Sequence, residues 1–135
     1  MILFTGLLGA LAGVAGAEHE VFYRYVVLGY VRDAGGAPVR GVQLELVRDK
    51  TGFSYLGQTG PDGFFLIVAR LGDESVGERL TLRTEQVTTV ITARFDPTNH
   101  ADHRGTRVDF QGGTVQERAA SFKTTLAHFL GSSTR

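Results

Sequence analysis

The chain has 135 residues, and its 14 basic and 14 acidic side chains give a formal net charge of zero. Such a chain has no overall field that would favour nucleic acid or an anionic surface, so we expect no nucleic-acid partner. Cysteine is absent, which excludes disulfides, thiolate catalysis, iron–sulfur clusters and zinc sites with cysteine ligands.

Residues 1–17 carry no charge and consist almost entirely of apolar residues and glycine. They end in Ala15-Gly16-Ala17, a small-x-small cleavage pattern, directly before Glu18. This combination predicts a secretory signal peptide, with a retained N-terminal membrane segment as the alternative. We therefore expect an exported protein, periplasmic or extracellular, which contacts the membrane through residues 1–17 if they are not removed.

Seven segments after residue 18 have the composition of β-strands, and turn signals separate them at intervals of roughly ten residues. The clearest alternation starts at Val42, where Val42, Leu44 and Leu46 point to one face and the residues between them to the other. This spacing predicts an all-β sandwich over residues 18–113. Its strands are expected near residues 22–32, 40–48, 53–58, 63–70, 78–84, 87–94 and 105–110.

One turn precedes the alternating strand at 40–48, and a second turn leads into the apolar strand at 63–70. The first runs from Asp33 to Pro38, where glycines permit positive φ and Pro38 fixes φ before the next strand. The second is Gly60-Pro61-Asp62-Gly63. The motifs Asp33-x-x-Gly36-x-Pro38-Val39-x-Gly41-Val42-x-Leu44 and Thr59-Gly60-x-Asp62-Gly63-Phe64-Phe65 resemble the carboxypeptidase regulatory-like domain. The resemblance covers roughly Val26 to Thr92.

The resemblance implies a seven-stranded antiparallel sandwich of the Ig-like or transthyretin-like kind. It also implies a binding or accessory role, because members of this family are mostly accessory and binding modules attached to many different partners. Fold alone does not fix function.

The polar loop that begins at Asp96 contains the one cluster of candidate metal ligands, His100, Asp102 and His103. Neutral imidazole and carboxylate are ligands for zinc and other divalent metals, and a catalytic zinc needs three protein ligands and an open position. One hypothesis is therefore a divalent metal site at 96–103. The alternative is a solvated loop with no cofactor, in which Asp96-Pro97 and Asn99 form turns.

Residues 114–135 are expected to form a C-terminal helix and tail. Phe122, Leu126, Phe129 and Leu130 fall at i, i+4, i+7 and i+8, which places them on one face of a helix. Such an apolar face must be covered, either by the sandwich or by a partner. The four residues are accordingly our candidates for partner binding.

Taken together, these features predict a non-catalytic exported module, not an enzyme, that docks on a larger envelope or membrane-associated protein assembly. The first alternative is a metal-binding protein or metal-dependent hydrolase that uses the His/Asp loop at 96–103. The second is an oligomeric carrier of a small ligand, as transthyretin is through its oligomeric channel.

Overall fold

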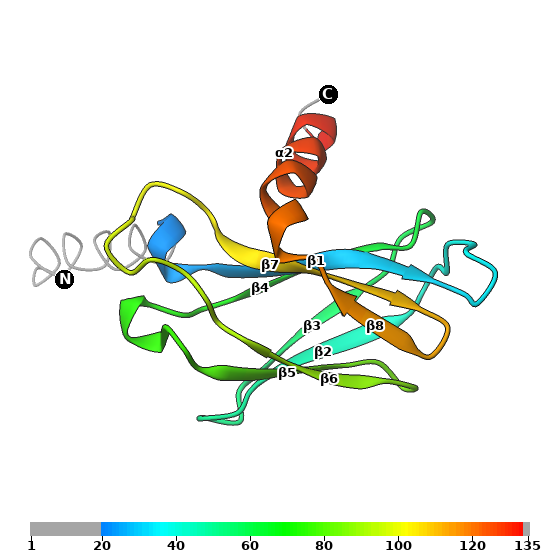
Figure 1. The fold of residues 1–135 in the computed structure, drawn as a ribbon, viewed down its shortest axis with the longest axis horizontal. Coiled ribbons are helices and arrows are strands. Elements are labelled where there is room, and N and C mark those ends of the chain that lie inside the picture. Colours follow the sequence, from blue (N-terminus) through cyan, green and yellow to red (C-terminus); the bar gives the residue numbers. More distant parts are fainter. Residues whose placement is uncertain (1–19, 134–135) are drawn as a thin grey trace, which may run out of the picture.

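The computed structural model describes residues 20–133, and the segment 1–17 expected to be a signal peptide or membrane anchor lies outside them. Within that range the chain is mostly β, with two four-stranded sheets and one short C-terminal helix (Figure 1). No helix in the described range is long and apolar enough to cross a membrane. The strands are β1 (Tyr25–Arg32), β2 (Gln43–Arg48), β3 (Ser54–Gln58), β4 (Phe64–Ala69), β5 (Arg79–Arg83), β6 (Thr88–Thr92), β7 (Arg104–Gln111) and β8 (Thr114–Glu117). The helices are α2 (Phe122–Ser133) and the 3₁₀ turns η1 (Val21–Tyr23), η2 (Asp73–Ser75) and η3 (Ala119–Ser121).

The strand orders are β4-β1-β7-β8 in one sheet and β3-β2-β5-β6 in the other. All neighbouring strands run antiparallel except β1 and β7, which are parallel in a register from Tyr25 opposite Arg104 to Arg32 opposite Gln111. The expected seven-stranded, wholly antiparallel Ig-like arrangement is therefore wrong in two respects: there are eight strands, and one pairing is parallel.

The eighth strand arises from a hairpin that the sequence prediction missed. Gly112 adopts φ 59°, and the chain turns back so that Val115 lies opposite Phe110 of β7. Val115 also packs against the main core. Residues 114–117 therefore belong to a sheet, and the helix expected within 114–135 begins only at Phe122.

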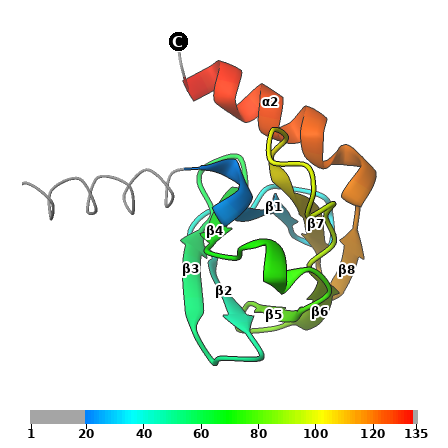
Figure 2. The same cartoon turned by 90° about the vertical axis from the view of Figure 1, so that its left-hand side faces the viewer.

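The main core lies between the two sheets, which face each other in end view (Figure 2). Inward-facing side chains of both sheets form it, as the alternation of period two requires. Its largest fully buried members are Tyr25, Phe65, Leu44, Leu46, Ile67, Leu71, Leu80, Leu82, Val27 and Val108.

Strand β1 is buried on both of its faces. Tyr25 and Val27 point into the main core, whereas Val26 and Leu28 point to the outer face of the sheet. There they form a second, smaller core with residues of α2, which lies over this sheet (Figure 2). The near-continuous apolar run of β1 is therefore the sequence of a strand covered from both sides.

Candidate functional site

The structure does not bring the three predicted metal ligands together. His100 Nε2 lies 2.8 Å from Asp73 Oδ2, and Asp102 Oδ2 accepts a hydrogen bond of 2.9 Å from Asn99 Nδ2. His103 lines a small hollow beside α2 with Asp102. Within residues 20–133 no group of three or more His, Cys, Asp or Glu side chains could hold a metal ion. The proposed His100–Asp102–His103 centre is therefore corrected: adjacency in the sequence did not produce convergent side chains.

The loop is organised around Arg104 instead of a metal. The Arg104 side chain is 3% exposed and donates to Asp73 Oδ1 at 2.8 Å, to the Phe22 carbonyl at 3.1 Å and to the Asn99 carbonyl at 3.1 Å. Its guanidinium also lies 4.2 Å from the ring centre of Phe95. These contacts fasten the loop to η1 and η2 and explain why an arginine stands at the start of β7.

Asp73→Asn is expected to loosen residues 96–103 at neutral pH. Arg104 first, and His100 second, hold the pKa of the Asp73 carboxyl below its ordinary value. Because this pKa is lowered, the charged contacts of Asp73 are fully present at any pH above the ordinary pKa of a carboxyl group. They are lost as pH falls through the lowered pKa. Amide protection factors, which correct for the slower intrinsic exchange in acid, should therefore fall in the loop of the wild type only in acid, and in the variant already at neutral pH.

The matched control is Asp62→Asn, because the Asp62 carboxylate accepts a hydrogen bond from the Phe64 amide in a turn remote from Arg104. Its loop at 96–103 should exchange like that of the wild type. Equal exchange in all three proteins would show that Asp73 does not hold the loop.

The predicted partner-binding face of the helix is used mostly inside the molecule. Phe122 and Leu126 are buried against Val26 and Leu28, and Phe129 stacks on Phe64 with ring centres 5.2 Å apart. Leu130 is 41% exposed. The prediction of a partner-binding face is thus corrected for Phe122 and Leu126, because the chain's own sheet supplies their cover.

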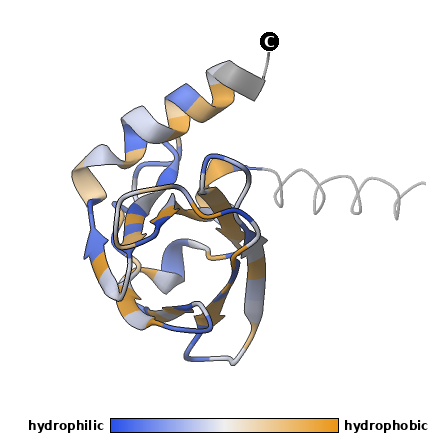
Figure 3. Ribbon diagram, turned by 90° about the vertical axis from the view of Figure 1, so that its right-hand side faces the viewer, coloured by the Kyte–Doolittle hydropathy of each residue, from blue (hydrophilic) through white to orange (hydrophobic). Residues whose placement is uncertain are grey.

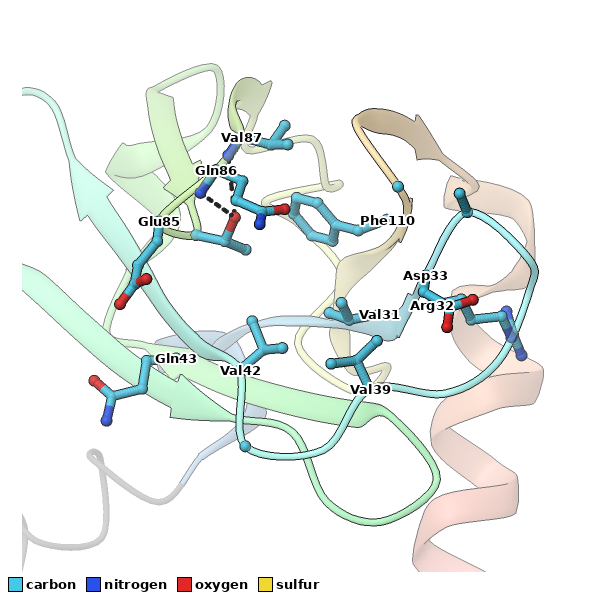
Figure 4. A pocket seen from close by; sticks show the side chains of 14 residues that line it. Val31, Arg32, Asp33, Val39, Val42, Gln43, Glu85, Gln86, Val87 and Phe110 are labelled. Atoms are coloured by element: carbon cyan, nitrogen blue, oxygen red, sulfur yellow. Dashed lines mark hydrogen bonds between the residues drawn. The ribbon is translucent and has the colours of Figure 1, made fainter.

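A different feature offers a binding site: a cleft at the end of the molecule where the 33–42 segment, the β5–β6 turn and the end of β7 meet (Figure 4). Figure 3 looks onto this end of the two sheets. We call it the end cleft. Its volume is about 730 Å³. The lining residues are Val31, Arg32, Asp33, Ala34, Val39, Gly41, Val42, Gln43, Thr84, Glu85, Gln86, Val87, Phe110 and Gly112.

The inner wall of the end cleft is apolar and belongs to the rim of the main core, while Arg32, Asp33 and Glu85 also line the cleft. Val31 and Phe110 are core residues, and Val39, Val42 and Val87 are partly buried against them. In Figure 4 Phe110 approaches the space from β7, while Val39 and Val42 enter it from the loop before β2. Both sheets therefore contribute, and the wall is fixed by the same packing that holds the layers together.

Hydrogen bonds fix the backbone around the cleft mouth. Thr84 Oγ1 accepts from the amides of Gln86 and Val87, both at 3.1 Å, and so shapes the β5–β6 turn. On the other side, Asp33 Oδ1 accepts from the amides of Gly35 at 3.0 Å and Ala37 at 2.9 Å. These are local side-chain-to-backbone turns of the kind that Asp and Thr favour.

The polar groups of the cleft suit binding better than proton transfer. No histidine lines it, and the Asp33 carboxylate is engaged by its own turn. Glu85 and Gln43 point outward in Figure 4, whereas the Gln86 side chain extends toward Phe110. The cleft therefore combines an apolar inner wall with a polar rim, where the neutral amide of Gln86 lies alongside the charged residues Arg32, Asp33 and Glu85.

The sequence pattern around residues 33–44 indicated only a turn and an alternating strand, and so gave no sign of half of the cleft. Val39 and Val42 look like ordinary core valines in the sequence. A usable signal was the pair of apolar residues in a loop of turn residues, because a loop valine must be covered by something. Its partners, Val87 and Phe110, lie far along the chain.

Comparison with known proteins gives structural neighbours only. No family model matches the sequence, and no curated protein matches it. The dioxygenase domain of a dioxygenase–carbohydrate-binding protein fusion from the cellulolytic bacterium Streptomyces sp. SirexAA-E is 20% identical over 68% of this chain and 80% of that one, with a TM-score of 0.46. An (S)-allantoin synthase is 15% identical over 73% of this chain, with a TM-score of 0.45, and the chain spans 44% of its length.

These neighbours overturn two related predictions without supplying a replacement. Both are described by the names of enzymes, which contradicts the prediction of a non-catalytic accessory module and the prediction that the chain is not an enzyme. Both predictions are therefore given up. With identities of 20% and 15% and TM-scores of 0.46 and 0.45, the likeness assigns neither an activity nor a site residue to this chain.

Proposed function

We propose that the protein binds a small, uncharged and largely apolar molecule in the end cleft. The observation that carries the proposal is the apolar wall of Val31, Val39, Val42, Val87 and Phe110, which surrounds a space of about 730 Å³ open to solvent. Ligand sites in proteins are commonly clefts of ~300–1,000 Å³ with mostly apolar walls and few polar groups.

The polar edge of the cleft supports a neutral ligand with one hydrogen-bonding group. The side-chain amide of Gln86 makes no hydrogen bond with any residue in the 20–133 range, and an amide both donates and accepts. Gln86 extends toward the apolar wall, so its amide is placed to orient a hydroxyl or carbonyl of the ligand (Figure 4).

We also propose that the fold is a β-sandwich of the carboxypeptidase regulatory-like kind. The shared core between two four-stranded sheets supports a β-sandwich, and the turns at Gly36, φ 92°, and Gly63, φ 78°, support the resemblance to the carboxypeptidase regulatory-like domain. The proposed ligand site lies within one chain, so it does not require the oligomeric channel of the carrier alternative.

Binding of 2-naphthol tests the proposal, since this neutral aromatic alcohol is fluorescent and the protein contains no tryptophan to interfere. We expect wild-type protein to bind it and to show amide chemical-shift changes confined to the cleft. Val42→Phe should weaken binding by about tenfold or more, because the ring fills the cleft.

Val90→Phe is the matched control, because Val90 is 46% exposed in β6 and does not line the cleft. It should bind 2-naphthol like the wild type. Binding that Val42→Phe leaves unchanged, or no binding by the wild type at millimolar probe, would rule out the proposed site.

A further inference from the structure

We propose that a second cavity, separate from the end cleft, binds a small organic anion with an apolar body. It lies where strands β3 and β4 form neighbouring edges of the two sheets, and its volume is about 680 Å³. We call it the arginine cavity. Arg24, Arg48 and Arg70 line it together with the apolar groups of Phe53, Tyr55 and Val68.

Strand pairing brings two of the three arginines to one place. Tyr25 of β1 pairs with Ala69 of β4 in an antiparallel register. The next residues outward from that pair are Arg24 and Arg70, so the two arginines stand side by side at the end of the sheet. No acidic side chain lines this cavity. The guanidinium groups of three arginines therefore belong to one cavity wall.

Arg48 is paired with an acidic residue at the border of the cavity. Arg48 donates from Nε to Glu78 Oε1 and from Nη2 to Glu78 Oε2, both at 2.7 Å, and Nη2 also reaches Ser75 Oγ at 3.1 Å. This bidentate pair holds the pKa of the Glu78 carboxyl below its ordinary value. Arg48 is therefore a fixed wall of the cavity, neutralised by Glu78.

Arg24 is different, because its Nε atom is buried and has no hydrogen-bond partner. Buried polar groups in folded proteins nearly always have a partner, and an exception calls for a bound ligand, ion or water. A guanidinium is best satisfied by a carboxylate or phosphate, which accepts two parallel hydrogen bonds. Arg104 Nε also lacks a partner, but only Arg24 lines this cavity. In our proposal Arg24 is therefore the residue that meets the anionic group.

The apolar part of the ligand follows from the other lining residues. Phe53 is 65% exposed and Val68 is 40% exposed, although large apolar side chains usually avoid water. Both lie beside the arginines in the same cavity. An anion with a hydrocarbon body would cover them while its charged end meets Arg24, which a bare inorganic anion would not do.

The experiment compares hexanoate, 1-hexanol and inorganic phosphate by amide chemical-shift titration of the full chain. Binding is read at the amides that line the arginine cavity, because 1-hexanol also suits the end cleft. We expect hexanoate to bind at least about tenfold more tightly than 1-hexanol and than phosphate, since only hexanoate offers both charge and chain. Arg24→Gln and Phe53→Ser should each weaken hexanoate binding by about tenfold. Phe53→Ser guards against loss of folding, because Phe53 is the more exposed residue.

Two controls isolate the cavity. Arg40→Gln removes an exposed arginine outside it, and Val42→Phe fills the end cleft, so both should leave hexanoate binding unchanged. The proposal is overturned if hexanoate does not bind at millimolar concentration or binds no better than 1-hexanol or phosphate. It is equally overturned if binding survives both Arg24→Gln and Phe53→Ser, whatever happens at the end cleft.

Discussion

Gly29→Ala is expected to remove most or all of the folded state. A β-carbon at this position would lie 1.7 Å from the carbonyl oxygen and 2.7 Å from the carbonyl carbon of Val108. Both atoms belong to the backbone of β7, which pairs with β1, so neither can rotate away. We expect a loss of more than about 4 kcal/mol, against a total stability of about 5–15 kcal/mol for an ordinary domain. Urea unfolding followed by circular dichroism measures the loss.

Gly113→Ala is the matched control for that experiment. A β-carbon at Gly113 would meet nothing within 4 Å, and Gly113 does not adopt positive φ. Its free energy of unfolding should stay within about 0.5 kcal/mol of the wild type. Similar urea midpoints for the two alanine variants would mean that β1 and β7 do not pack backbone to backbone at Gly29.

Gly29 illustrates that the sequence predicted the positions of the strands but not how they pair. The alternation of apolar residues located seven strands, because alternation is a local property. It could not show that β1 pairs in parallel with β7, since Gly29 and Val108 lie 79 positions apart and neither residue type signals the other. The missed strand β8 has a similar cause: Val115 contributes one inward-facing apolar residue, too few for a recognisable alternation.

The candidate sites were harder to predict, because clefts are made by tertiary contacts. His100, Asp102 and His103 stood out because they are close in sequence, yet their side chains turn to different neighbours. The end cleft draws on Val42, Val87 and Phe110, whose spacing carries no motif. Only the concentration of turn residues around 33–42 was visible beforehand, and it indicated a loop without indicating what the loop enclosed.

The sequence predicted the C-terminal helix but left open what covers its apolar face. Its apolar face was evident, whereas its cover was left between the sandwich and a partner. The deciding signal lies in β1, where Tyr25, Val26, Val27 and Leu28 are apolar in succession. A strand whose outward residues are also apolar needs a cover on its outer face, and α2 is the element that supplies it.

Phe122→Ala is therefore expected to destabilise the whole domain, not merely to release a partner. Phe122 is 3% exposed in the second core, and a β-carbon on Gly105 of β7 would lie 2.6 Å from two atoms of its ring, which shows how closely the ring rests on the strand. Removing a buried phenylalanine costs about 3–5 kcal/mol through lost contacts and the cavity left behind. Urea unfolding should show this loss.

Leu130→Ala is the matched control, because it removes an apolar side chain from the same helix at a more exposed position. Leu130 lies two turns further along the same helix and is 41% exposed, so its replacement should change the free energy of unfolding by less than about 1 kcal/mol. If Phe122→Ala were as stable as Leu130→Ala, the helix would not be bound to the sheet in solution, and its apolar face would again need a partner. A large difference between the two variants instead fixes α2 as the outer layer of the fold, which accounts for Val26 and Leu28 without any second protein.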